Sequence, residues 1–167
     1  AKEKSDDPFA DLFSENKTRV WRDNTGNFEI EAKLAEIHED LLILQKNWTL
    51  LRLYDCSPHA ERVLQVIEQH RLPFQVMLGA YLGAEMNNFG CPWGATYPEE
   101  QLEANQRENA AEVERLIKLA RQYEDIVFSV AVGNEATVDW TDHFVPGEQM
   151  VAYVRSAKAG VRQPVTF

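Results

Sequence analysis

Along the chain, short continuous apolar runs alternate with stretches in which apolar residues recur every three or four positions. Three short apolar runs bounded by loop residues have the length and composition of buried strands, at Leu50–Asp55, Phe74–Leu82 and Ile126–Val132. Each is followed by a loop and a stretch with apolar residues three and four positions apart, which predicts helices at about 57–71, 98–120 and 147–158. Regular alternation of this kind predicts βαβ units, a parallel sheet and the α/β fold class.

The chain changes character near residue 34. Residues 1–17 are mostly polar and charged without a sustained period, so a flexible tail is expected there. Residues 18–33 hold a turn-rich stretch, Asp23 to Gly26, followed by alternating Phe28, Ile30 and Ala32, and this predicts a β-hairpin segment. The spacing from Leu34 to Lys46 instead predicts a helix that leads into the first strand of a domain spanning 34–167.

Composition excludes some classes of partner. The 167 residues are 44% apolar, enough for a core, and the net charge is −10. This charge disfavours nucleic acid and anionic membranes, because binding to phosphates relies on clustered Lys and Arg. No run of 18 apolar residues and no signal-peptide pattern occurs, so no membrane partner is expected and the compartment stays open. Ala1 in place of Met and the strand-like end at Phe167 suggest a fragment or a processed chain.

Cys56 and Cys91 each follow a predicted strand. A disulfide between them is geometrically open, but two buried free thiols are the favoured interpretation. A metal site would have to add His59 and His143, and no ligand spacing typical of zinc is present. We therefore expect no metal and no cofactor.

The most informative motif is Gly133-Asn134-Glu135, directly after the apolar run Ile126–Val132. It brings a carboxylate, preceded by an amide, to the carboxyl end of a buried parallel strand, which is where β/α barrels keep their chemistry. Glu135 could also be an ordinary rim acid bonded to a backbone amide. Asp55 ends another strand and could face the same mouth, although acids in such places often cap the following loop.

Six segments, in this order, resemble the first half of glycoside hydrolase family 17: IHEDLLIL, LLRLYD, HAERVLQVI, QVMLGAYL, VAVGNEA and QPVTF. The resemblance covers roughly Leu34 to Phe167. It implies a (β/α)8 TIM barrel of retaining β-1,3-glucanases and glucan transglycosylases, and so a hydrolase of carbohydrate metabolism. At 167 residues the chain is short for a closed barrel, which typically takes about 250. The expected fold is therefore a partial barrel of about four parallel strands.

The resemblance also implies roles for particular residues. Glu135 matches the acid/base of the family, and Asn134 stands where a hydrogen bond to the sugar 2-hydroxyl would be made. The nucleophile of the family is a Glu at the end of the seventh strand, beyond the strands of this chain. Retaining hydrolysis needs two carboxyl groups about 5 to 5.5 Å apart, so this chain alone is expected to be inactive.

Aromatic residues gather in the loops after the predicted strands, and rings of this kind stack on the apolar faces of sugar rings. Asn87 and Asn88, in the loop after the second strand, could add contacts to hydroxyls. We expect a β-glucan or oligosaccharide as the partner of a substrate-binding group made of Tyr54, Asp55, Tyr81, Trp93, Trp140 and His143. A half barrel would also leave open sheet edges, through which copies of the chain could associate.

A second resemblance concerns the segment RVWRDNTGNFEIEAKL, which resembles the start of the SH3-like homology domain of an endocytic actin adaptor. It conflicts with the helix expected from Leu34 onward. Three readings follow: a glycosidase-type domain, a noncatalytic carbohydrate-binding or protein-interaction module, and a chimeric fragment without activity.

Overall fold

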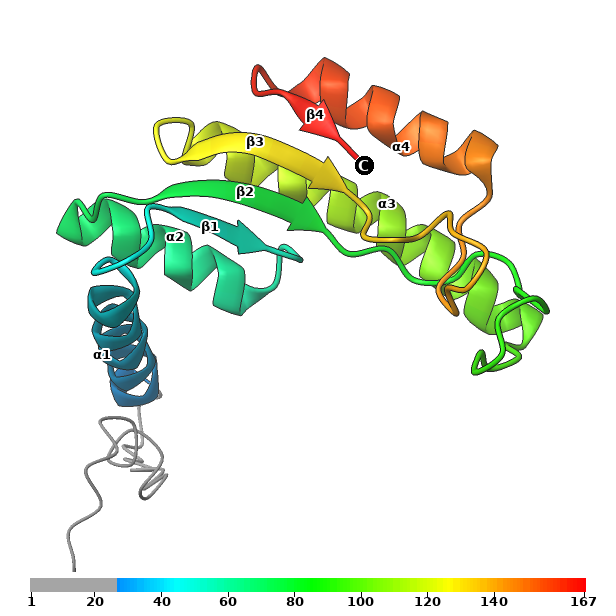
Figure 1. The fold of residues 1–167 in the computed structure, drawn as a ribbon, viewed down its shortest axis with the longest axis horizontal. Coiled ribbons are helices and arrows are strands. Elements are labelled where there is room, and N and C mark those ends of the chain that lie inside the picture. The colour runs from blue at the N-terminus through cyan, green and yellow to red at the C-terminus, as the bar shows by residue number, and fades with distance from the viewer. Residues whose placement is uncertain (1–26) are drawn as a thin grey trace, which may run out of the picture.

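A computed structural model describes residues 27–167, with side chains from residue 33 onward. Four strands alternate with four helices in the order α1 (Asn27–Leu44), β1 (Leu50–Leu53), α2 (Pro58–His70), β2 (Gln75–Ala80), α3 (Glu99–Gln122), β3 (Val127–Val132), α4 (Gly147–Gly160) and β4 (Val165–Thr166). All strands are parallel and lie in the order β1-β2-β3-β4 (Figure 1). The expected α/β fold is confirmed, and the described sheet is an open arc with edges at β1 and β4.

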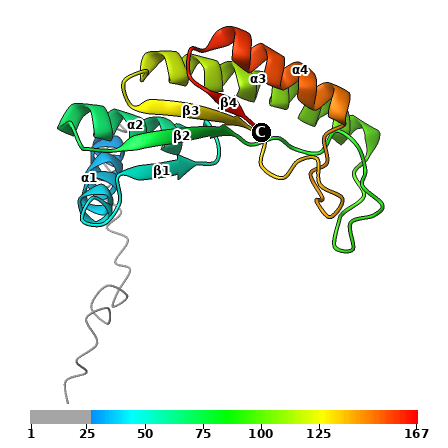
Figure 2. The same ribbon diagram turned by 45° about the horizontal axis from the view of Figure 1, so that its top comes forward.

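The helices α2, α3 and α4 lie on the same face of the sheet (Figures 1 and 2). Leu78 of β2 stands beside Val130 of β3, and both are fully buried. Leu64 of α2 and Leu116 of α3 are fully buried in the same core. The three-and-four spacing of apolar residues is what turns one side of each helix toward the strands.

The ends of the helices follow the local sequence signals. Ser57 caps α2 by accepting a hydrogen bond from the Ala60 amide, and Pro58 fills the first turn, where no backbone donor is needed. Arg71 closes α2 in the left-handed conformation, at φ 51°. Helix α4 ends at Gly160, as the sequence predicts. Ser57 and Pro58 thus fix a strand–helix junction at the carboxyl edge of the sheet, whereas Arg71 and Gly160 end their helices at the amino edge.

The N-terminal helix α1 requires a correction. It begins at Asn27, ahead of the expected start at Leu34, so the hairpin predicted for residues 18–33 is wrong over 27–33. An alternation of three apolar residues is weaker than the helix propensity of Glu, Ala, Lys and Leu in the same stretch. Ile37 and Leu41 are buried where α1 packs against α2. The tail expected at 1–17, and the start of the hairpin segment, lie outside the described residues.

The sheet face opposite the helices carries polar side chains as well as apolar ones. Arg52, Met77 and Ser129 are paired neighbours on β1, β2 and β3, so their side chains share this face. The alternating exposure of β1 is that of an edge strand. Among residues 27–167, no helix is long and apolar enough to cross a membrane.

Candidate functional site

Two long loops at the carboxyl edge of the sheet are joined into one rim. The loop between β2 and α3 runs over residues 81–98, and the loop between β3 and α4 over residues 133–146 (Figures 1 and 2). The Asn88 side-chain amide donates to the carbonyl oxygens of Asp139 (2.7 Å) and Thr141 (2.9 Å). The Glu85 amide donates to the Phe144 carbonyl (2.9 Å). The amide group of Asn88 is therefore occupied by protein, which weakens its expected role as a ligand contact.

The turn that carries Glu135 is anchored before and after it. The Gly133 amide, in a residue at φ 79°, donates to the Ala80 carbonyl of β2 (2.8 Å). The Val145 amide donates to the Ala136 carbonyl (2.7 Å). Glu135 itself is exposed and has φ 55°, a left-handed conformation that costs a non-glycine residue about 1–2 kcal/mol. Strain of this kind at a strand end is typical of functional sites.

Asn134 is held through both its side chain and its backbone. The Arg52 guanidinium donates from Nη2 to Asn134 Oδ1 (3.1 Å), and His143 donates from Nε2 to the Asn134 carbonyl (2.8 Å). Because Oδ1 accepts from Arg52, the side-chain nitrogen of Asn134 is the atom left to donate to an external acceptor. The contact with Arg52 thus fixes which way the amide faces.

A chain of contacts extends this arrangement across the strand ends. The Arg52 guanidinium lies 4.6 Å from the centre of the Tyr54 ring, within cation–π range. On the other side, the Tyr81 and His143 rings have centroids 5.1 Å apart. Burial, followed by the charge of Asp142, raises the pKa of Tyr81, so its hydroxyl stays protonated and can donate at neutral pH. Tyr54, Tyr81 and Asn134, which each follow a strand, are therefore brought together with His143 of the β3–α4 loop.

The other expected site residues have mixed placements. Trp93 and Trp140 lie on the two joined loops, with exposed side chains. The Cys91 thiol donates to the Trp140 carbonyl (3.1 Å), so the two tryptophan-bearing segments are linked. Asp55 accepts a hydrogen bond from the Ser57 amide (3.0 Å), which is the capping geometry common to acids at strand ends.

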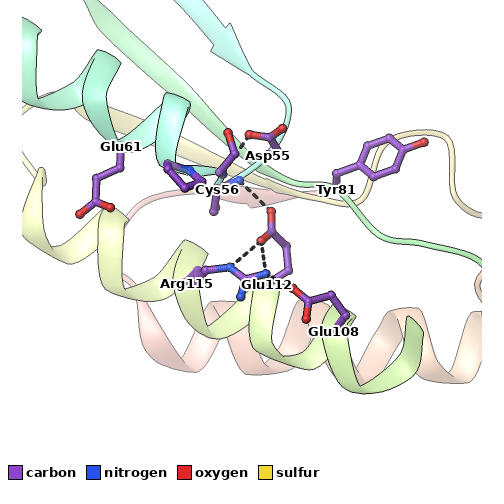
Figure 3. Close-up of a pocket in the computed structure, with 9 residues that line it drawn as sticks. Asp55, Cys56, Glu61, Tyr81, Glu108, Glu112 and Arg115 are labelled. Carbon is purple, nitrogen blue, oxygen red and sulfur yellow. Dashed lines mark hydrogen bonds and ion pairs between the residues drawn. The ribbon is translucent and has the colours of Figure 1, made fainter. Parts of the chain in front are cut away.

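Beside this rim, a pocket of about 560 Å³ opens between the β1–α2 connection and α3 (Figure 3). Glu112 of α3 is its central group: Oε1 accepts from the Cys56 amide (2.7 Å) and Oε2 from Arg115 Nε (2.9 Å). The carboxylate is thus satisfied from both sides, and it ties the loop after β1 to α3. Tyr81 lines this pocket as well.

Both cysteines are free and buried, as expected. Burial, with a smaller contribution from Glu112, raises the pKa of the Cys56 thiol well above its usual range, which keeps it protonated and inert. The thiol donates to the Gly79 carbonyl (3.2 Å). In residues 27–167, no group of three His, Cys, Asp or Glu side chains is arranged to hold a metal ion.

Sequence reasoning missed two contributors to the site. Arg52 lies within an otherwise apolar strand, and no role is assigned to it from the sequence. Its position two residues before Tyr54 puts both side chains on the same face of the strand, which is a signal for a shared site. Asp142, in the loop after Glu135, lies with Oδ1 3.0 Å from His143 Nδ1. This hydrogen bond is the main cause that lowers the pKa of Asp142.

Comparison with known proteins adds three findings. A family model for the SLA1 homology domain 1 matches residues 12–48, a short N-terminal part of the chain. No curated protein matches the chain. Among solved structures, the chain is similar to an endo-laminarinase from Formosa Hel1_33_131, at 27% identity and a TM-score of 0.60, over 75% of this chain and 32% of that one. The chain therefore spans about a third of the length of this neighbour and has a glycosidase-like fold.

The match to the SLA1 homology domain 1 agrees with the second resemblance found in the sequence. Over residues 27–44 that match coincides with α1, a helix. The helix is what the resemblance to the hydrolase requires in the part from Leu34 onward. For this stretch, the fold therefore favours the glycosidase-like reading.

Proposed function

We propose that this chain is part of a retaining glycosidase of glycoside hydrolase family 17 that acts on β-1,3-glucan, with Glu135 as the acid/base and Asn134 as its supporting amide. The observation that carries the proposal is the held Asn134–Glu135 turn at the carboxyl end of β3, in a fold similar to part of an endo-laminarinase. The proposal covers hydrolysis and transglycosylation alike, since both use the same first step.

In this mechanism the chain would supply one of the two catalytic carboxyl groups, the acid/base. Glu135 would donate a proton to the leaving glycosidic oxygen, while an ionised carboxylate attacks the anomeric carbon from the other side. Asn134 would donate from its side-chain nitrogen to the sugar 2-hydroxyl, in the orientation that Arg52 fixes. The nucleophile would come from an element beyond these four strands. We therefore expect this chain to bind glucan without turning it over.

The first experiment incubates the purified chain with laminari-oligosaccharides and follows binding and product release in the same samples. We expect binding without turnover, and equal binding by Glu135→Gln, which removes the proton donor and keeps the shape. Cello-oligosaccharides of equal length serve as the control for linkage. Absence of binding by the wild-type chain would contradict the proposal. Turnover that Glu135→Gln abolishes would mean that a second carboxylate is supplied within the chain or by another copy.

The exposed rings of the rim give a second prediction. Trp93→Ala and Trp140→Ala should each weaken binding of laminari-oligosaccharides by about 1 kcal/mol if the ring stacks on a sugar. Isothermal titration calorimetry measures the loss. Trp48→Ala is the matched control, because Trp48 is a similarly exposed tryptophan that precedes the amino end of β1. Unchanged affinity in both Trp93→Ala and Trp140→Ala would make these two tryptophans packing residues of the joined loops.

A second candidate function is a noncatalytic carbohydrate-binding or protein-interaction module. The observation in its favour is the match of residues 12–48 to the SLA1 homology domain 1, a family other than that of the endo-laminarinase. A truncated chain starting at Asn27 separates the two. Glucan binding retained by residues 27–167 supports the glycosidase-derived site. Binding lost on truncation, in a chain that still folds, supports a module built around the N-terminal segment.

We also infer that copies of the chain associate through the open sheet edges. Among residues 27–167, β1 pairs only with β2 and β4 only with β3, so backbone groups on the outer sides of these two strands have no strand partner there. Exposed Leu50 and Phe167 lie at these two strands or next to them. Sedimentation velocity over a range of concentrations should show association. A monodisperse monomer that binds little hydrophobic dye would overturn this expectation.

A further inference from the structure

We propose that His143 is a positioning residue that holds Glu135 in its left-handed conformation, by donating a hydrogen bond from Nε2 to the carbonyl of Asn134. The importance of that conformation for catalysis rests on the proposed function. The contact itself does not, because it follows from the structure alone.

The partners of the imidazole ring fix which nitrogen carries a proton. A backbone carbonyl can only accept, so the 2.8 Å contact with Asn134 requires a hydrogen on Nε2. The Thr141 hydroxyl lies nearer to Nδ1 (2.9 Å) than to Nε2 (3.3 Å), and the Asp142 carboxylate lies 3.0 Å from Nδ1. A bare Nδ1 can accept from Thr141, and a protonated Nδ1 can donate to Asp142. The ring thus keeps the same orientation in both charge states, with Nε2 aimed at Asn134.

Packing holds the ring as firmly as its hydrogen bonds do. The His143 side chain is only 17% exposed, and its face lies near the Tyr81 ring. Thr141 is buried, and its carbonyl is held by Asn88 from the neighbouring loop. His143 is therefore a fixed donor supplied by the rim, and it reaches back across nine residues to the strand end. Both ring nitrogens are occupied by protein, so only the ring face is left for the substrate contact expected from the sequence.

The bonded carbonyl is the one that controls Glu135. It belongs to the peptide that joins Asn134 to Glu135, so fixing its direction fixes the plane from which the φ angle of Glu135 is measured. On either side, the Gly133 amide and the Ala136 carbonyl are bonded to Ala80 and Val145. The contact with His143 completes this set at the peptide next to the strained residue. Without it, Glu135 could relax to the negative φ that L-residues prefer.

The test uses the full chain, isotopically labelled, and the NOE between the amide and Hα protons of Glu135, which is strong only at positive φ. His143→Phe keeps a ring against Tyr81 and removes the donor, while His143→Gln restores a donor at a similar reach. We expect the NOE to be strong in the wild type and His143→Gln and weak in His143→Phe. Affinity for laminari-oligosaccharides should fall about fivefold in His143→Phe and stay close to wild type in His143→Gln. Asp139→Asn, in the same loop, is the control.

The outcomes separate this inference from the proposed function. A wild-type chain that binds no oligosaccharide contradicts the proposed function, while the NOE comparison still decides the role of His143. A strong NOE in His143→Phe overturns the inference, and so does an equal loss in His143→Phe and His143→Gln, since the donor would then be irrelevant. Should His143→Phe fail to fold, the ring spectrum of the wild type decides: a neutral ring with its proton on Nδ1 excludes the donation.

Discussion

Gly79→Ala is expected to lower the free energy of unfolding by about 3 kcal/mol, at the upper end for an overpacked core site. A methyl group at Gly79 would lie 2.7 Å from the Leu53 carbonyl oxygen and 2.9 Å from that of Tyr54. Both obstacles are backbone, so no side chain can turn away, and β1 and β2 would have to separate. Chemical denaturation followed by circular dichroism measures the loss.

The matched control is Gly147→Ala at the start of α4, where an added methyl group meets nothing within 4 Å. Alanine there should be neutral or stabilise the chain by up to about 1 kcal/mol, since it restricts the unfolded chain and favours helix. Equal losses in the two variants would mean that Gly79 is sensitive for a reason other than the close approach of β1.

The effect of Gly79→Ala should extend to the candidate site. The atoms that the methyl group would displace belong to the end of β1, which also carries Arg52 and Tyr54. Moving this strand end would disturb the contact between Arg52 and Asn134. We therefore expect Gly79→Ala to weaken oligosaccharide binding in the fraction that remains folded, whereas Gly147→Ala should leave binding unchanged.

The alternation of strands and helices could be predicted because its signals are local. Most residues of β2 and β3 are buried, so both strands have nearly continuous apolar sequences. Ser57 and Pro58 mark the start of α2 without reference to any distant residue. The start of α1 could not be predicted in this way. Over residues 27–33, helix propensity favours a helix while the alternation of apolar residues favours a strand. The packing of α1 against α2, which lies further along the helix, cannot be inferred from that stretch.

The residues of the candidate site likewise fall into those with a local sequence signal and those whose role depends on the fold. Asn134 and Glu135 could be predicted because the motif directly follows a strand, and position at a strand end is itself the signal. Arg52 and Glu112 act on residues 82 and 56 positions away, so their roles depend on which strands and helices become neighbours. Glu112 and Arg115, three residues apart, read as an ordinary surface pair until the fold places the Cys56 amide against the same carboxylate.

Glu112→Ala is expected to lower the free energy of unfolding by about 2–3 kcal/mol, because it leaves the buried Cys56 amide without an acceptor and Arg115 without its more buried partner. Glu108→Ala is the matched control on the same helix. Glu108 also pairs with Arg115, but its side chain is 69% exposed, and such pairs contribute about 0–1 kcal/mol. Equal effects of the two substitutions would show that the bond to the Cys56 amide adds nothing.

A second measurement uses the reactivity of the Cys56 thiol. A general loss of stability would expose Cys56 and Cys91 alike, so a change at Cys56 alone would be specific to the Glu112 contact. Burial is the main cause of its raised pKa, and the Glu112 carboxylate raises it further. Glu112→Ala removes this charge and frees the loop after β1, so Cys56 should react faster with a thiol reagent at alkaline pH under native conditions. Cys91, which bonds to the Trp140 carbonyl in the other rim loop, should keep its wild-type rate. An equal rise in the reaction rate of both cysteines would indicate global unfolding. It would give no support to a specific role of the Glu112–Cys56 contact in linking α3 to the loop after β1.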